Sequence, residues 1–380
     1  MTKRLTPNRI AIFLPSLKGG GAERAMVTLA NAFADRGYAV DLVLALGEGP
    51  YLQSVGPKVC VVDLRAGRVL KALLPLIRYM RREKPVAMLS VMTHANVIAI
   101  LARLLARVKT RLVVSERTTM SVEASRARGF TERSIFAVVP VLYRSADCVT
   151  AVSRDCAVDL QHFFGFQAHP VEFIYNPFEL ELIRKRAEET VSHPWFEPGQ
   201  PPVVLAIGRL NQAKDYPTLI RAFSKLRANR DVRLMILGEG ELRIDLEGIV
   251  AECGLGAEQV QLPGFVSNPF AYLARCAVFA LSSHYEGLPG ALIEAMACGT
   301  PVVSTDCPSG PREILEDGRW GSLVPVGDED ALAEAIDTVL STPQASLPDV
   351  RGRAEDFGLP QAVDKYLNVL NLPLEQKCAT

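Results

Sequence analysis

The sequence has few of the features that mark a membrane-spanning, secreted or nucleic-acid-binding protein. No apolar run reaches the roughly 20 residues that a membrane-spanning helix needs, and the first residues lead directly into a strand pattern without the apolar core of a signal peptide. Only 7% of the residues are aromatic, and they form no platforms among basic residues of the kind that bind nucleic acid. We therefore expect a cytoplasmic protein with peripheral membrane contact at most and no nucleic-acid partner.

The sequence also lacks a cysteine pattern and a metal-ligand pattern. None of the eight cysteines forms a C-x-x-C pair, so we interpret them as small buried side chains of a reducing compartment. The run Asp-Glu-Asp at 328–330 formally matches a metal-binding D-x-D. It directly precedes a helical pattern, however, where a helix cap and first-turn acids explain it better. We predict no metal and no other cofactor.

Two glycine-rich stretches fall short of the common nucleotide-binding motifs. "GGGAER" at 19–24 has an arginine where the third glycine of G-x-G-x-x-G would stand, and no Gly-Lys-Ser/Thr follows it. "LGEGELR" at 237–243 contains two glycines and no third. A Rossmann-type oxidoreductase is therefore disfavoured.

The length and the charge distribution suggest two unlike halves. A chain of 380 residues is long for one core, so two domains are expected. The formal net charge is zero, but residues 1–180 carry 24 Lys/Arg against 14 Asp/Glu, a net charge of +10, and the remainder carries −10. A basic N-terminal half suggests an anionic partner on that side.

Short apolar runs alternate with longer helical patterns in two series, which predicts two doubly wound α/β domains with parallel sheets. The series are separated by a polar helix and a proline-rich stretch. We expect a first Rossmann-like domain at 1–178, a linker at 179–202, a second Rossmann-like domain at 203–360 and a terminal segment at 361–380. The expected strands are 9–15, 39–46, 59–64, 86–91, 111–115 and 148–153 in the first domain, and 203–210, 232–240, 260–265, 277–283 and 300–305 in the second.

The stretch "HYEGLPGALIEAMACGTPVV" at 284–303 predicts a ligand site at the end of a strand. Pro289 or Gly290 is suited to start a helix and Gly299 to end it. Free backbone N–H groups at such a helix start attract phosphate or sugar oxygens. Glu286 in the loop and Glu294 in the helix could accept hydrogen bonds from sugar hydroxyls. The alternative is that both acids only favour the helix dipole.

Two further loops leave expected strands with ligand-binding residue types. Arg209 and Lys214 lie in "GRLNQAKDYPTLIRAF" at 208–223, where two cations favour a diphosphate over an ordinary surface role. Gly20 and Gly21 permit a ligand to approach the backbone closely.

Together these stretches resemble the family 4 retaining glycosyltransferases, which have the GT-B fold. The resemblance extends over nearly the whole chain, and its most specific part is the E-x7-E motif of Glu286 and Glu294. It implies two Rossmann-like domains that face each other across a cleft, and a final helix that crosses back to the first domain. The stretches that carry it are "GGGAER", "SERT", "GRLNQAKDYPTLIRAF", "ILGEGELR", "LPGF" and "SSHYEGLPGALIEAMACGTPVVSTDCPSGPREIL".

The resemblance also implies roles for individual residues. Arg209 and Lys214 would hold the donor diphosphate and stabilise the leaving group, and Glu294 would bind the ribose. The catalytic candidates are His94, Arg209, Lys214 and Glu286. The candidates for donor binding are Gly20, Gly21, Arg209, Lys214, Glu286, Gly287, Leu288, Pro289 and Glu294, and Glu116 and Arg117 are assigned to the acceptor side.

A basic segment adds a prediction for the acceptor side. Arg78, Arg81 and Arg82 share one helix face beside apolar residues, and each cation near an anionic membrane contributes about 1 kcal/mol. An ordinary solvated face is the alternative. With the positive charge of the first half, this favours an acceptor at the inner face of the cell membrane.

We therefore predict a retaining glycosyltransferase that moves a hexose or an N-acetylhexosamine from a UDP-sugar to a lipid-diphosphate-linked or surface glycan. The local phrases favour N-acetylgalactosamine. The alternatives are a UDP-sugar 2-epimerase on the same fold and a non-catalytic protein that binds nucleotide sugars.

Overall fold

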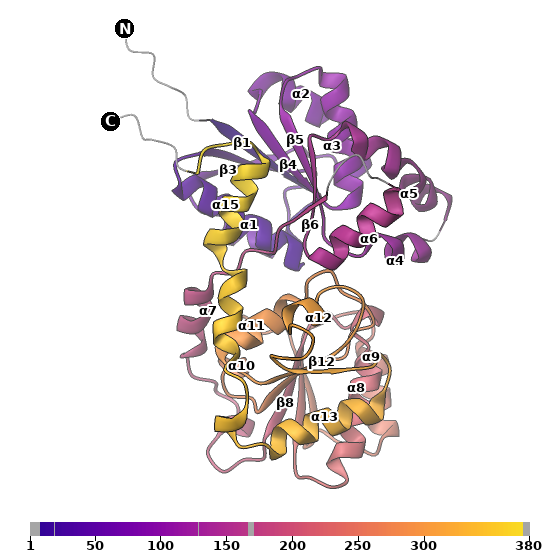
Figure 1. The fold of residues 1–380 in the computed structure, drawn as a ribbon, viewed down its shortest axis with the longest axis vertical. Helices are drawn as coiled ribbons and strands as arrows, with labels where there is room; N and C mark the ends of the chain where they lie inside the picture. Colours follow the sequence, from indigo (N-terminus) through magenta and orange to yellow (C-terminus); the bar gives the residue numbers. More distant parts are fainter. Residues whose placement is uncertain (1–7, 19, 128, 166–170, 375–380) are drawn as a thin grey trace. The chain divides into compact units, whose positions relative to one another are not determined.

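The computed structural model describes residues 8–18, 20–127, 129–165 and 171–374, and the chain divides into two units (Figure 1). Unit 1 comprises Met1–Phe178 and Phe357–Thr380, and unit 2 comprises Glu179–Asp356. All the strand pairs in both units are parallel, which confirms the predicted pair of doubly wound α/β domains.

The sheet of unit 1 has seven strands in the order β3-β2-β1-β4-β5-β6-β7. The six expected strands are present within a few residues of their expected bounds. The last strand was not expected, because three residues are too few to show an apolar pattern. The strands are β1 (Arg9–Leu14), β2 (Ala39–Leu44), β3 (Val59–Asp63), β4 (Ala87–Val91), β5 (Arg111–Glu116), β6 (Cys148–Ala151) and β7 (Val171–Phe173).

Helices cover this sheet because the strands are apolar on both faces. Successive side chains of a strand point to opposite faces, so Ile10, Ile12 and Leu14 of β1 enter one core cluster while Ala11 and Phe13 are buried on the other side. The helices of unit 1 are α1 (Gly21–Asp35), α2 (Leu73–Glu83), α3 (Thr93–Ala106), α4 (Met120–Arg126), α5 (Phe130–Leu142), α6 (Arg154–Phe164) and α15 (Leu359–Val369).

The last helix of the chain belongs to unit 1, where it lies beside α1 (Figure 1). Tyr366 and Leu367 of α15 are fully buried in the same core cluster as β1. The chain re-enters unit 1 where Leu359 N donates to Phe178 O at 2.9 Å, next to the point where it leaves. The segment expected at 361–380 thus contains most of a helix that completes the core of unit 1.

The sheet of unit 2 has six strands in the order β10-β9-β8-β11-β12-β13. Five were expected, and the short last one was not, for the same reason as in unit 1. The strands are β8 (Val203–Ile207), β9 (Arg233–Leu237), β10 (Val260–Gly264), β11 (Val278–Leu281), β12 (Val302–Thr305) and β13 (Ser322–Val324).

The helices of unit 2 begin before its first strand, in the segment that we expected to be a linker at 179–202. The first helix buries Leu180, Ile183 and Ala187 and packs against two other helices of unit 2. It is therefore a packed element of this unit. The helices are α7 (Leu180–Ala187), α8 (Tyr216–Arg227), α9 (Arg243–Glu252), α10 (Pro269–Leu273), α11 (Gly290–Cys298), α12 (Pro311–Ile314), α13 (Glu329–Ser341) and α14 (Val350–Ala354).

Candidate functional site

Each sheet has one point where the strand order reverses direction, and several of the predicted site residues follow the strands on either side of it. In unit 2 the reversal lies between β8 and β11, and in unit 1 between β1 and β4. Loops leave the carboxyl ends of neighbouring strands in opposite directions at such a point, which opens a crevice where ligands of α/β sheets bind. The loops and helix starts that follow these four strands contain Arg209 and Lys214, Glu286, Gly20 and Gly21, and His94.

In unit 2, Lys214 and Glu286 form an ion pair across the crevice between β8 and β11. Lys214 Nζ lies 2.6 Å from Glu286 Oε1, and the two side chains are only 19% and 13% exposed. Ser283 Oγ donates to the same carboxylate oxygen at 2.6 Å. The structure thus brings together two of the predicted catalytic residues, which lie 72 positions apart in the sequence.

Hydrogen bonds to backbone carbonyl groups join these two loops. His284 N donates to Ala213 O at 2.8 Å, and Ser282 Oγ donates to Lys214 O at 2.7 Å. The loop after β12 joins them, because Glu286 N donates to Pro308 O at 3.1 Å. The positions of Lys214 and Glu286 are therefore set by the sheet rather than by flexible loop ends.

A contact between a histidine and a carboxylate lies beside the first pair. His284 Nε2 is 3.5 Å from Asp215 Oδ2, and Asp215 is 7% exposed with a left-handed φ of 46°. The sequence interpretation missed this pair and Ser283. The adjacency of Asp215 to Lys214, and of Ser283 and His284 to Glu286, was the only available signal.

Helix α11 starts and ends where the sequence predicted. Pro289 caps its start, Gly290 is its first residue, and Gly299 ends it with a φ of 81°. Glu294 is 4% exposed within it.

The turn at 287–289, which leads into α11, is held from one side by Gly310. This glycine has a φ of 102°, and a Cβ atom on it would lie 2.5 Å from the Pro289 Cδ atom. The sequence interpretation missed this residue, although it falls in the quoted motif. Gly287, Leu288 and Pro289 are all buried in this turn.

Arg209 differs from Lys214 in its exposure. Its side chain is 71% exposed and lies 3.2 Å from Glu241, which is 56% exposed. Such a pair contributes little to stability, so the Arg209 guanidinium can exchange partners at small cost.

The two glycines of "LGEGELR" have a packing role in the structure. A Cβ atom on Gly238 would collide with the carbonyl oxygen of Gly208, and one on Gly240 with that of Leu210. Leu210 N donates to Glu239 O at 2.9 Å. These glycines therefore allow the loop after β9 to approach the loop that holds Arg209 and Lys214.

In unit 1, Gly20 and Gly21 lie at the start of α1. A Cβ atom on Gly20 would collide with the carboxylate of Glu23, whereas one on Gly21 would meet nothing within 4 Å. Burial raises the pKa of Glu23, although the backbone N–H groups of Glu23 and Gly20 donate to the carboxylate and lower it. In the structure, backbone N–H groups at this helix start therefore bind the protein's own carboxylate.

His94 is the second residue of α3 and is exposed, while Thr93 and Asn96 of the same turn are buried. The residue before the helix, Met92, has a φ of 79°, which is uncommon for a residue with a side chain. Its N–H group donates to Ser115 O at 3.1 Å, so the start of α3 is joined to the end of β5.

Glu116 is the last residue of β5 and Arg117 follows it, and the two side chains are bound on opposite faces of the sheet. Glu116 is 2% exposed and accepts hydrogen bonds from Thr93 Oγ1 at 2.9 Å, Asn96 Nδ2 at 3.0 Å and the hydroxyl of Tyr143. Burial raises its pKa to about 7, although these three donors lower it.

Arg117 is 9% exposed and is bound on the other face of the sheet. It donates to Asn176 Oδ1 at 2.6 Å, to Met26 Sδ at 3.2 Å and to the Tyr366 hydroxyl at 3.2 Å. Glu116 and Arg117 therefore both have protein partners, and their expected role on the acceptor side stays a prediction.

Arg78, Arg81 and Arg82 are all exposed on α2. Arg82 pairs with Glu83 at 2.6 Å. Arg81 donates to Leu105 O at 2.8 Å, at the C-terminal end of α3, where a cation is favoured by the helix dipole.

The D-x-D run at 328–330 has the helix-capping role that we expected. Asp328 is the N-cap of α13 and accepts a hydrogen bond from Ala331 N at 2.9 Å. Within the described residues, no group of three or more His, Cys, Asp or Glu side chains could hold a metal ion. No helix of the described chain is long and apolar enough to cross a membrane.

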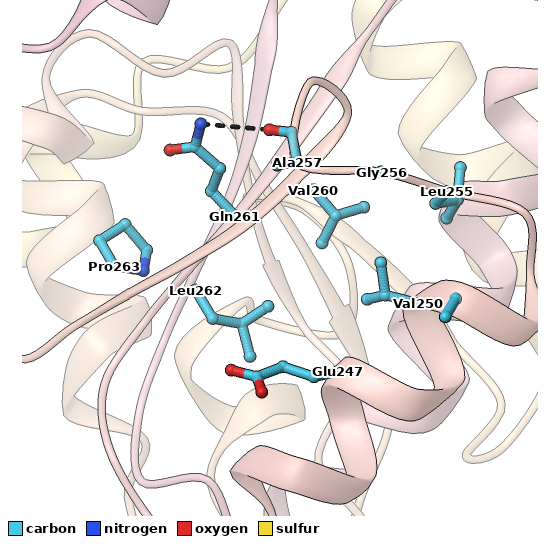
Figure 2. A pocket seen from close by; sticks show the side chains of 10 residues that line it. Glu247, Val250, Leu255, Gly256, Ala257, Val260, Gln261, Leu262 and Pro263 are labelled. Carbon is cyan, nitrogen blue, oxygen red and sulfur yellow. Dashed lines mark hydrogen bonds between the residues drawn. The ribbon is translucent and has the colours of Figure 1, made fainter.

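A hollow of about 370 Å³ lies at the edge of unit 2, between α9 and β10 (Figure 2). Its lining is mainly apolar and includes Val250, Leu255 and Leu262. Gln261 Nε2 donates to Ala257 O at 3.2 Å, so this polar group is already bound. None of the predicted site residues lines the hollow, and it is separate from the crevice at β8 and β11.

Comparisons with known proteins agree with the fold and the motifs. Residues 188–354 match the family described as "Glycosyl transferases group 1", and residues 19–182 match "Glycosyltransferase Family 4". The structure of Anabaena HepE in complex with UDP superimposes with a TM-score of 0.79 at 22% identity, over 96% of this chain and 99% of that one. The predicted GT-B fold is confirmed.

Two curated relatives extend over most of the chain. One is the N-acetylgalactosamine-N,N'-diacetylbacillosaminyl-diphospho-undecaprenol 4-alpha-N-acetylgalactosaminyltransferase of Campylobacter jejuni, 33% identical over 87% of this chain and 90% of that protein. The other is the lipopolysaccharide core biosynthesis glycosyltransferase LpsE of Rhizobium meliloti, 27% identical over 85% and 86%. The chain therefore belongs to the group 1 and family 4 glycosyltransferases and has their two-unit GT-B architecture.

Proposed function

We propose that the protein is a retaining glycosyltransferase that moves a hexose or an N-acetylhexosamine, with N-acetylgalactosamine favoured, from a UDP-sugar to a lipid-diphosphate-linked or surface glycan. The observation that carries this proposal is the Lys214–Glu286 pair at the strand-order reversal of unit 2, beside the start of α11. The activity for which the Campylobacter relative is named supports the sugar and the acceptor class.

On the donor side, Lys214 and Arg209 would bind the diphosphate. Lys214 is held at the carboxyl end of the sheet by the loop contacts, while the exposed Arg209 can turn from Glu241 to a phosphate oxygen. The two cations would stabilise the charge that develops on the leaving diphosphate. Glu294 would bind the ribose, and Glu286 with the 287–289 turn would bind the transferred sugar. The complex of HepE with UDP supports UDP as the nucleotide of the sugar donor.

Unit 1 would contribute His94 near the reactive face of the sugar, and Gly20 and Gly21 near the phosphates. The bond from the sugar C1 atom to the diphosphate would break as the acceptor oxygen attacks from the same face, with its proton passing to the departing phosphate. The matched motifs provide no separate carboxylate nucleophile, which favours this front-side route. We propose no metal, since Lys214 and Arg209 can provide the positive charge.

On the acceptor side, α2 offers a surface for an anionic membrane. Leu74, Arg78, Arg81 and Arg82 lie on one helix face, and Leu74 is 63% exposed. The hydrogen bond from Arg81 to Leu105 O brings this face beside Leu105, which is 53% exposed. A surface of arginines and exposed leucines fits the interface of an anionic bilayer at the inner face of the cell membrane.

The test is the release of UDP from a panel of UDP-sugars, with and without a membrane extract of the source cell. We expect release that requires the extract, is fastest with UDP-N-acetylgalactosamine, and falls at least about 100-fold in Lys214→Ala and Glu294→Ala. Matched controls are Lys225→Ala and Glu334→Ala, which remove the same residue types from exposed helix faces of unit 2.

Other outcomes would support the alternatives. Acceptor-free conversion of the UDP-sugar would indicate a 2-epimerase, and binding of UDP without turnover would indicate a non-catalytic protein. Product with the opposite anomeric configuration to the donor would rule out retention, as judged by the proton coupling at C1.

A further inference from the structure

A buried polar cluster at the end of β5 contacts the first turn of α3 on both sides of His94. Thr93, the residue before His94, donates to Glu116 Oε2 at 2.9 Å, and Asn96, two residues after it, donates to Glu116 Oε1 at 3.0 Å. Thr93 is 4% exposed and Asn96 is fully buried. One carboxylate therefore binds a residue on each side of an exposed histidine.

Hydrogen bonds to one backbone carbonyl fix the same turn. Met92 N and Asn96 Nδ2 both donate to Ser115 O, each at 3.1 Å. Met92 has a left-handed φ of 79°, a conformation that persists only where the surroundings enforce it. The direction in which α3 starts, and with it the position of His94, is thus set by its contacts with Ser115 and Glu116.

The cluster is completed from two other elements. The hydroxyl of Tyr143, in the single helical turn after α5, donates to Glu116 Oε1, and the like charge of Glu123 in α4 raises the pKa of Glu116 further. Tyr143 is 1% exposed and, like Glu116, has a pKa raised by burial. Two carboxylate oxygens can accept all three donors, whereas the NH₂ group of a glutamine would face at least one of them.

We propose that Glu116 is a positioning residue for the transfer reaction, which holds the first turn of α3 so that the imidazole of His94 keeps one orientation. This inference rests on the proposed role of His94. The competing explanation is that Glu116 only stabilises unit 1. The two differ in whether the effect of Glu116 passes through His94.

Unit 1 contains a matched control for that distinction. Asp41 of β2 is another buried carboxylate, 1% exposed, that accepts from the Tyr79 hydroxyl at 2.7 Å and from Arg9 at 2.6 Å. It lies near the middle of its strand and contacts neither β5 nor α3 in these hydrogen bonds. Asp41→Asn should therefore lower the melting temperature without changing the orientation of His94.

The first experiment is independent of any enzymatic activity. We expect Glu116→Gln to raise the hydrogen-exchange rate of the amides at 93–97 at least about tenfold and to shift the His94 ring resonance, which His94→Ala identifies. If Glu116→Gln does not fold, Thr93→Val takes its place, because it removes one hydrogen bond and keeps the side-chain shape. It should raise the exchange rate and shift the resonance in the same direction. Unchanged exchange and an unchanged resonance in a folded variant would overturn the proposal.

The second experiment is a double-mutant cycle on turnover of UDP-N-acetylgalactosamine with the membrane extract. Glu116→Gln should lower kcat about tenfold or more and leave the donor KM within about twofold, because the change leaves Arg209, Lys214 and Glu294 of unit 2 untouched. In the His94→Ala background the same change should cost less than about twofold, and Asp41→Asn should leave kcat within about twofold in either background. Equal losses from Glu116→Gln in both backgrounds would overturn the proposal.

The two experiments separate the inference from the proposed function. If the wild-type protein turns over none of the UDP-sugars, the proposed function fails. The exchange rates and the His94 resonance then still decide whether Glu116 holds this turn.

Discussion

At the scale of single residues, burial separates the two cations of unit 2. Lys214 is largely enclosed with Glu286, whereas Arg209 and Glu241 are more than half exposed. Removing one member of an enclosed pair leaves a charge without its partner, while an exposed pair loses little. Under the proposed function, a diphosphate that binds Lys214 would therefore compete with the Glu286 carboxylate.

This competition gives a prediction for Glu286→Gln. The change should lower the stability of the free protein by about 1–3 kcal/mol, since Lys214 loses a charged acceptor. It should also tighten UDP binding about fivefold, equivalent to about 1 kcal/mol, because the phosphate no longer competes for Lys214. Titration calorimetry with UDP measures this, with Glu241→Gln as the exposed-pair control that should stay within about twofold. Weaker UDP binding in Glu286→Gln would contradict the expectation.

Glu116 gives a prediction for the pH dependence of stability. Burial raises its pKa to about 7 in the folded protein, above the ordinary value of 4.5 that applies to the unfolded chain. Between these two pH values the folded state binds more protons than the unfolded chain does. The free energy of unfolding therefore falls as the pH rises from about 4.5 to about 7. The full fall corresponds to about 3 kcal/mol.

Urea unfolding at pH 5 and pH 8 measures this dependence. The difference between the two pH values should be smaller in Glu116→Gln than in the wild type by up to that amount, because the variant has no carboxyl group to titrate. An identical pH dependence in the two proteins would show that Glu116 titrates in the folded state as it does in the unfolded chain.

At the scale of elements, the helix starts and the loops between strands depend on glycines with different roles. Gly299 ends α11 through its left-handed backbone, whereas Gly310 combines a positive φ with a close approach to Pro289. A glycine of the first kind can be placed from the sequence. One of the second kind depends on which loop lies against it, and this follows from the order of β11 and β12 in the sheet.

Gly310→Ala should therefore weaken donor binding. The added Cβ atom would lie 2.5 Å from Pro289 Cδ and would displace the 287–289 turn. We expect the affinity for UDP-N-acetylgalactosamine to fall about tenfold, measured by calorimetry. Gly327→Ala is the matched control, because Gly327 has a similar positive φ of 75° but nothing within 4 Å of an added Cβ atom. Equal effects of both changes would indicate that backbone strain alone is responsible.

At the scale of the whole molecule, the separation of charge is the main feature that the neutral total conceals. The net charge of +10 in residues 1–180 belongs almost wholly to unit 1, and the face of α2 with Leu74 adds apolar contact to it. Electrostatic attraction to a bilayer weakens with salt, while apolar insertion does not, so the two contributions can be separated.

We expect the protein to sediment with vesicles that contain phosphatidylglycerol and not with pure phosphatidylcholine vesicles. The triple change Arg78→Ala, Arg81→Ala and Arg82→Ala should weaken binding at low salt at least about tenfold, since each cation contributes about 1 kcal/mol. Leu74→Ser should instead reduce the binding that persists at high salt. Replacing Lys58, an exposed cation paired with Asp35 on another part of unit 1, is the control. Binding to neutral vesicles that equals binding to anionic ones would contradict an electrostatic role.

The sequence by itself determined the two parallel α/β sheets, most strand positions, the ends of α11 and the capping role of Asp328. These depend on local patterns of apolar residues, glycine, proline and short polar side chains. The loops that hold the site residues were also placed correctly, because parallel strands direct their carboxyl ends to one edge.

Only the tertiary structure decided which side chains meet. Lys214 meets Glu286 because β8 and β11 are neighbours in the sheet. Glu116 and Arg117 are separated because Arg117 directly follows the last residue of β5 and consecutive residues of an extended backbone point to opposite sides. The partners Tyr143 and Tyr366 come from segments 27 and 249 positions away from Glu116 and Arg117. Such partners are fixed by the packing of whole elements, which no local pattern encodes.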